Sequence, residues 1–328
     1  MIRLGVIGTN WITDQFVQGA LESGEYRLSA VYSRSLSSAA QFADKYQDGA
    51  SIQLFDDLDL LAASNDVDAI YIASPNSLHA PQSIQMLAAG KHVICEKPIA
   101  ANADLADQMY QTAKENNVVL FEAFMSCHTP NFKLIKQKLP TLGKLSKAFI
   151  TYCQYSSRYD KYLAGENPNT FNPQFANGSI MDIGYYCLAS AVSLFGKPKT
   201  VNAVGQLLES GVDGNGSVIL GYDTFEVVLQ HSKTSNSYLP SEIQGEAGAL
   251  LINMISIAEK VTHVRKGEQP EDISLPQFEN RMRYEAEAFA EQVKTNTMDK
   301  ECMERSLLVA QLLTEIRRQV GVVFPQDK

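Results

Sequence analysis

The chain has 328 residues, of which 45% are hydrophobic and 20% charged, and 28 lysines and arginines against 37 aspartates and glutamates give a formal net charge of −9. This composition is typical of a globular protein of about two domains, and the acidic balance argues against nucleic acid or an anionic membrane as a partner. The scattered cysteines form no CxxC pair and fit a reducing cytoplasm. No signal peptide, 18-residue apolar run or zinc-ligand spacing is evident.

The first 120 residues alternate between short apolar runs and segments with helical spacing. Repeated strand–helix units predict a parallel sheet covered on both faces, the doubly wound α/β (Rossmann) design. The expected strands are 2–7, 27–32, 67–73, 92–95 and 118–121, and the expected helices are 12–23, 37–46, 78–89 and 103–115.

The pattern changes after Glu122, where strands with turn signals and little intervening helix predict a largely antiparallel sheet. We therefore expect a dinucleotide-binding domain at 1–122 and an α+β domain at 123–328. In the second domain we expect a strand at 147–155, a polar loop at 156–177, a helix at 178–195, strands between 201 and 264, and helices at 278–293 and 301–319.

The stretch Gly5-Val-Ile-Gly8-Thr-Asn10-Trp-Ile-Thr13 lies where a dinucleotide-binding turn would join the first strand to the first helix. The G-x-G-x-x-G/A pattern would place glycines at 8 and 10 and a small residue at 13. Gly8 fits, whereas Asn10 and Thr13 replace the others. Asparagine tolerates unusual backbone angles, so a pyrophosphate at the helix N-terminus remains compatible with this turn. The alternative is an ordinary strand-to-helix turn.

The end of the second strand reads Tyr32-Ser33-Arg34-Ser35 and has no acidic residue for the ribose 2′-hydroxyl of NAD. A guanidinium flanked by hydroxyls suits a 2′-phosphate. This favours NADP over NAD, the alternative being a solvated surface arginine.

Two further turns follow strands of the first domain, and ligands of doubly wound sheets bind at such carboxyl ends. In Ser74-Pro-Asn-Ser-Leu-His79, Asn76 and His79 are candidate site residues, although Asn76 or Ser77 as a helix cap is an equal explanation. In Glu96-Lys97-Pro98, proline restricts Lys97 to an extended backbone and is compatible with a cis peptide. A lysine held there can face a substrate hydroxyl; the alternative is a surface ion pair at a strand end.

The segment 178–195 carries Asp182 and Tyr186, whose spacing puts both on one helical face, with Tyr185 pointing elsewhere. Gly184 inside this helix hints at a close backbone approach. An aspartate beside a tyrosine hydroxyl suits proton transfer; the alternative is a core helix with one tyrosine bonded to an aspartate. Candidates for a substrate pocket nearby are Tyr152, Tyr155, Arg158 and Tyr159.

In this order, Gly-x-x-Gly-Thr, S-P-N-x-x-H, E-K-P and D-x-G-x-Y resemble the glucose-fructose oxidoreductase/inositol dehydrogenase (Gfo/Idh/MocA-type) family over essentially the whole chain. The subgroup with dimeric dihydrodiol dehydrogenases looks nearest. The resemblance implies a Rossmann domain, a second domain with a large open sheet, NAD or NADP as cofactor, and a sugar, polyol or diol as substrate. It also implies a homodimer or homotetramer formed through that sheet.

By this resemblance Lys97 is the active-site lysine, and Tyr186 or Lys97 transfers the proton while Asp182 orients one of them or binds a substrate hydroxyl. The departures at Asn10 and Thr13 leave the individual pyrophosphate contacts open. Two other readings remain, a non-catalytic NADP-binding regulator and a hydrolase or isomerase that uses tightly bound NAD transiently. The expected cofactor-binding residues are Gly8, Thr9, Asn10, Trp11, Ile12, Ser33, Arg34, Ser74, Pro75, Asn76, His79, Glu96 and Lys97.

Overall fold

The computed structural model describes residues 1–46 and 51–328. The chain divides into two compact units, one formed by 1–124 with 278–306 and the other by 125–277 with 307–328. The segment 278–306, which the sequence placed in the second domain, therefore belongs to the first. Its apolar side chains explain this, because Phe289 packs against Phe121 at 5.8 Å between ring centroids. Periodicity predicts such a helix but not which core it joins.

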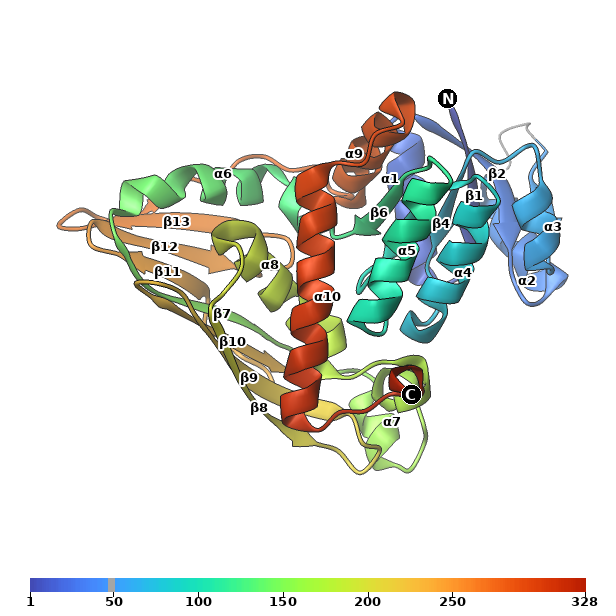
Figure 1. Cartoon of the computed structure of the whole chain (residues 1–328). Coiled ribbons are helices and arrows are strands. Elements are labelled where there is room, and N and C mark those ends of the chain that lie inside the picture. The colour runs from blue at the N-terminus through green and yellow to red at the C-terminus, as the bar shows by residue number, and fades with distance from the viewer. Residues whose placement is uncertain (47–50) are drawn as a thin grey trace. The chain divides into compact units, whose positions relative to one another are not determined.

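The first unit contains a parallel six-stranded sheet in the order β3-β2-β1-β4-β5-β6, which confirms the Rossmann design. Helices α4 and α5 lie side by side against it, and α1 packs with α9 (Figure 1). The short β3 and α3 were not predicted, because three and six residues are too few to show a repeated hydrophobic period. The elements are β1 (Ile2–Ile7), α1 (Trp11–Glu22), β2 (Tyr26–Tyr32), α2 (Leu36–Ala43), β3 (Gln53–Phe55), α3 (Leu58–Ala63), β4 (Ala69–Ile72), α4 (Asn76–Ala88), β5 (His92–Glu96), α5 (Ala103–Glu115), β6 (Leu120–Ala123), α9 (Met282–Thr295) and the first turns of α10 (Lys300–Val320).

The second unit contains an eight-stranded sheet in the order β14-β13-β12-β11-β7-β10-β9-β8. Only the described pair β7–β10 is parallel, so the prediction of a mostly antiparallel sheet is confirmed. Helix α8 packs on β7 and β10, and α6 packs on β13 (Figure 1). The elements are α6 (Pro130–Lys138), β7 (Leu145–Cys153), α7 (Tyr159–Leu163), a π-helix (Ile180–Gly184), α8 (Tyr185–Phe195), β8 (Thr200–Leu207), β9 (Asp213–Gly221), β10 (Glu226–Ser232), β11 (Ser241–Gly245), β12 (Gly248–Asn253), β13 (Lys260–Arg265) and β14 (Glu271–Asp272).

Among the described residues, one helical stretch, Pro173–Phe195, is long and apolar enough to cross a membrane by length and composition. Within the fold, 72% of its most apolar window is buried. That burial is expected of a core helix. The stretch comprises α8, which packs on β7 and β10 of the second sheet, and the short helical turns before it.

Candidate functional site

The turn after β1 keeps the geometry of a nucleotide-binding turn despite its altered sequence. Gly8 has a φ of +108°, and a Cβ there would come within 3.1 Å of the Ala73 carbonyl oxygen, so glycine is required. Asn10 is the N-cap of α1: its Oδ1 accepts from the Thr13 N–H at 3.1 Å, and its Nδ2 donates to the Ala73 oxygen at 2.9 Å. Asn10 thus fixes this turn to the end of β4, while the neighbouring Trp11 is 72% exposed.

The carboxyl end of β2 adjoins the same turn, because the Gly8 N–H donates to the Tyr32 carbonyl at 3.2 Å. Ser33 and Arg34 follow directly, with Ser33 half-buried and Arg34 exposed. Ser35 is the N-cap residue of α2, although its hydroxyl contacts the Ser37 hydroxyl at 2.7 Å instead of capping the helix. A guanidinium and hydroxyls therefore lie beside the Gly8 turn.

His79 is a buried residue whose side chain connects two turns of the backbone. It is 1% exposed, and its two ring nitrogens each lie 2.9 Å from a carbonyl oxygen, of Pro98 and of Ser74. Burial lowers the pKa of His79, against the opposing effect of the two carbonyls. The capping explanation for this turn was wrong, because the N-cap of α4 is Pro75 and Asn76 already lies inside the helix. His79 instead joins the turns after β4 and β5.

Lys97 is half-buried, whereas every other residue between 93 and 101, all of which the structure describes, is buried. The Lys97–Pro98 peptide bond is cis, as the sequence allowed. The preceding Glu96 is buried; its Oε1 accepts from the Tyr71 hydroxyl at 2.7 Å and its Oε2 from the Lys97 N–H at 3.2 Å. Glu96 therefore supports the backbone from which the Lys97 side chain projects.

Two other buried glutamates near this turn were missed by sequence reasoning. Glu122 accepts from the Ile99 N–H at 2.9 Å and from the Ser306 hydroxyl at 2.6 Å. Glu285, on α9, is fully buried, and neither carboxyl oxygen has a hydrogen-bond partner among the described residues. Burial, and then the charge of Glu96, raise its pKa well above the usual value. A signal was available, since Glu285 lies at helical spacing among the apolar Met282, Ala286 and Phe289.

In the second unit, Asp182 and Tyr186 are half-buried, whereas the other residues of the described stretch 178–192 are buried. The expected single helix is instead a π-helix carrying Asp182 followed by α8, and π-turns are frequent at functional sites. Tyr185 is buried, as predicted. The ring of Tyr186 lies 5.8 Å from that of Tyr152, so the structure brings this candidate pocket residue to the site.

Buried polar groups on β9 and β10 support the π-helix from behind. A Cβ on Gly184 would lie 2.9 Å from His231 Cγ, which confirms the predicted close approach. His231 Nδ1 lies 2.8 Å from the Ser179 hydroxyl, and burial lowers the pKa of His231 to about 3. Asp213 accepts from the Ile180 N–H at 2.7 Å, and burial raises its pKa to about 6.

Asp182 forms an ion pair that the sequence did not predict. The ammonium of Lys233 donates to Asp182 Oδ2, and the two side chains are 7% and 33% exposed. Lys233 follows β10 in a polar stretch, so neither spacing nor periodicity singles it out. This face therefore presents the partly exposed carboxylate of Asp182, which is paired with the buried ammonium of Lys233 and lies one turn before Tyr186.

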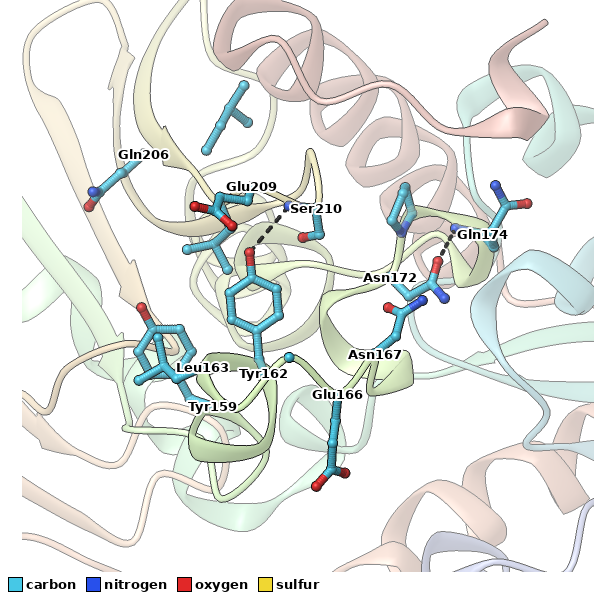
Figure 2. A pocket seen from close by; sticks show the side chains of 14 residues that line it. Tyr159, Tyr162, Leu163, Glu166, Asn167, Asn172, Gln174, Gln206, Glu209 and Ser210 are labelled. Carbon is cyan, nitrogen blue, oxygen red and sulfur yellow. Dashed lines mark hydrogen bonds between the residues drawn. The ribbon is translucent and has the colours of Figure 1, made fainter.

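The loop after β7 helps to line a hollow of about 860 Å³ within the second unit (Figure 2). Tyr159 and Tyr162 of α7 stack at 5.9 Å between centroids, and the Tyr162 hydroxyl accepts from the Ser210 N–H at 3.2 Å. Asn167 and Gln174 add amide groups to the same wall. Of the candidate pocket residues, Tyr159 lines this hollow, and Tyr155 contacts Tyr159.

Comparisons with known proteins agree with this geometry. Residues 2–124 match the family model "Oxidoreductase family, NAD-binding Rossmann fold", and residues 139–251 match the "GFO/IDH/MocA C-terminal domain". The chain belongs to the GFO/IDH/MocA oxidoreductase family. It is therefore an oxidoreductase with a nucleotide-binding Rossmann unit, as the motifs predicted.

Relatives in this family match over their full length. The uncharacterized oxidoreductase YgjR of Escherichia coli is 57% identical over 100% of this chain and 99% of its own. The scyllo-inositol 2-dehydrogenase (NADP(+)) IolU of Bacillus subtilis is 47% identical over 100% of both chains. The trans-1,2-dihydrobenzene-1,2-diol dehydrogenase of mouse is 28% identical over 100% and 99%. The 3-ketoreductase KijD10 of Actinomadura kijaniata has the same fold, with a TM-score of 0.87 at 24% identity over 98% and 99%.

Proposed function

We propose that the chain is an NADP-preferring dehydrogenase or reductase that acts on a CH–OH group of a sugar or polyol. The observation that carries the proposal is burial. In each unit one segment is buried except at half-buried side chains that the family resemblance assigns to the reaction, Lys97 in 93–101 and Asp182 with Tyr186 in 178–192. Proton-transfer groups held on such rigid segments suit hydride chemistry at an alcohol carbon.

The residues of the first unit fit a nicotinamide dinucleotide. Gly8 leaves the space that a Cβ would fill, and the N-terminus of α1 offers amides to a phosphate. Arg34 with Ser33 lies where a 2′-phosphate would be bound, which supports NADP over NAD. The bound nicotinamide would supply hydride transfer to or from the substrate carbon.

The protein's own part in the reaction is to hold the substrate oxygen and move its proton. Tyr186 is the proposed proton donor and acceptor, and Lys97 is proposed to polarise the substrate oxygen. Asp182 accepts a hydrogen bond from a neighbouring substrate hydroxyl, because an ionised carboxylate is a strong acceptor. The name and full-length identity of IolU favour a cyclic polyol of the inositol type as substrate. A cytoplasmic homodimer or homotetramer formed through the second sheet is part of the same proposal.

Cofactor choice is tested by titrating the protein with NADPH and with NADH while following fluorescence of its one tryptophan, Trp11. The variant Arg34→Ala should weaken NADPH binding roughly 10- to 100-fold, as expected for lost charged hydrogen bonds, and leave NADH unchanged. The matched control is Arg27→Ala, at an exposed arginine on β2, the strand that precedes Arg34. Equal loss for both cofactors would contradict the assignment of Arg34.

The reaction itself is tested with Lys97→Met and Tyr186→Phe on a panel of inositols and sugars. Turnover should fall by about 10²- to 10⁴-fold in both variants, the usual contribution of general acid–base groups, and Tyr186→Phe should keep its affinity for NADPH. Near-normal turnover in both variants would refute the site. Binding of NADPH without turnover of any alcohol in the wild type would favour the regulator, and cofactor absorbance retained through purification would favour the hydrolase or isomerase.

A further inference from the structure

Two hydrogen bonds fix the main chain of Lys233. Its N–H donates to the Gly214 carbonyl at 2.9 Å, and its own carbonyl accepts from the Ser156 N–H at 2.9 Å. Ser156 begins the loop that carries the aromatic wall of the hollow in Figure 2. The main chain from which the Lys233 side chain extends is therefore fixed between the end of β10 and that loop.

The Lys233 side chain ends in an ion pair with Asp182 whose two members differ in exposure. Its ammonium is buried, whereas the Asp182 carboxylate that accepts from it is about one-third exposed, at 33%. A buried ammonium must be paired, and a charge-assisted hydrogen bond from a fixed ammonium restricts the orientation of the carboxylate that accepts it. We propose that Lys233 is a positioning residue for the reaction: it fixes Asp182 in the orientation and the ionised form that accept a hydrogen bond from a substrate hydroxyl.

The other charged or titratable groups near Lys233 do not compete for this role. Asp213 feels the charge of Lys233, which lowers its pKa against the larger effect of burial, but its Oδ2 is already bound by the Ile180 N–H. His231 lies 3.8 Å from Asp213, and burial keeps it neutral. Asp182 is thus the direct partner of the ammonium.

Stability alone does not explain the pair. Replacing a buried ion pair by apolar residues is often neutral or favourable, so such a pair is weak evidence for a stabilising role. The position of the carboxylate, on the π-helix beside Tyr186 and at the surface, is what a role in substrate binding requires.

The test is a double-mutant cycle of Lys233→Met and Asp182→Asn, and it rests on the proposed dehydrogenase activity. Lys233→Met should lower kcat/KM for the polyol about 10- to 100-fold, mainly through KM, and should move the acid limb of the pH profile upward by about one unit. NADPH affinity should not change. In the Asp182→Asn background, Lys233→Met should cause no further loss. Lys147→Met, which breaks the exposed pair with Glu226 on the neighbouring strand, should leave kcat/KM unchanged.

A second readout does not depend on activity. Asp182→Asn leaves the buried ammonium unpaired and should lower Tm by about 5 °C or more, and adding Lys233→Met should recover much of that loss. A loss of kcat/KM from Lys233→Met that is equal in both backgrounds would overturn the proposal, as would additive Tm changes. If the wild type turns over no polyol, the proposed function fails, and the Tm cycle then decides alone whether Lys233 fixes Asp182.

Discussion

The buried imidazole of His231 is expected to make the stability of the folded protein fall at acid pH. Its ring is 3% exposed, and burial lowers its pKa from 6.5 to about 3. Below pH 6.5 the unfolded chain takes up a proton that the folded chain resists. The contribution of His231 to stability is therefore fully present above pH 6.5 and is lost as the pH falls towards 3.

The size of this loss follows from linkage. Between pH 8 and pH 5 the free energy of unfolding should fall by about 1.5 log units of the equilibrium constant, or about 2 kcal/mol, and by about 4 kcal/mol at pH 3. His231→Gln removes the titration and keeps a polar group that can reach the Ser179 hydroxyl. The cavity or strain that the variant introduces is the same at every pH, so only the slope carries information.

The assay is urea unfolding of both proteins from pH 8 to pH 5, followed by circular dichroism. The free energy of unfolding of the wild type should fall relative to that of His231→Gln by about 2 kcal/mol across this range. Curves that stay parallel would show that His231 titrates normally in the folded protein. That result would refute the reasoning from burial.

Two other substitutions test the packing beneath the proposed site. Gly184→Ala should lower Tm, because the new Cβ would lie 2.9 Å from both His231 Cγ and Ile180 Cδ1, and overpacking of about 1–3 kcal/mol exceeds the helix propensity gained; a raised Tm would contradict this. Glu285→Gln should stabilise the protein increasingly above pH ~4.3, the usual glutamate pKa, because the raised pKa of Glu285 means that the wild type loses stability as the pH rises. Tm values of both proteins at pH 4.5 and pH 8 check the sign, and an equal difference at both would count against it.

Much of the first unit was predictable because its signals are local. The apolar runs located β1, β2, β4, β5 and β6, and α5 was predicted with its observed bounds, Ala103–Glu115. Gly8 was singled out correctly because a tight turn between strand and helix needs a glycine. The use of Asn10 as a helix cap bound to Ala73 was not predictable, since it depends on a partner 63 residues away.

The rest of the site could not be predicted because it consists of partners brought together by the fold. Lys233 and Asp182 are 51 residues apart, and Tyr71 and Glu96 are 25 apart. A single sequence gives the periodicity of each segment but not the register between segments. The π-helix was missed for a related reason, because one extra residue in a turn shifts no apolar position far enough to break the helical pattern.

Several buried polar groups contact the half-buried side chains of the proposed site or the backbone that carries them. Glu96 and Tyr71 support the backbone of Lys97, and Lys233 holds Asp182. Each such group costs desolvation energy that an apolar residue would avoid. Fixed dipoles and charges are useful where charge develops during a reaction, because they need not reorganise at that moment. We therefore interpret these groups as the means by which each unit holds its exposed side chain ready for chemistry.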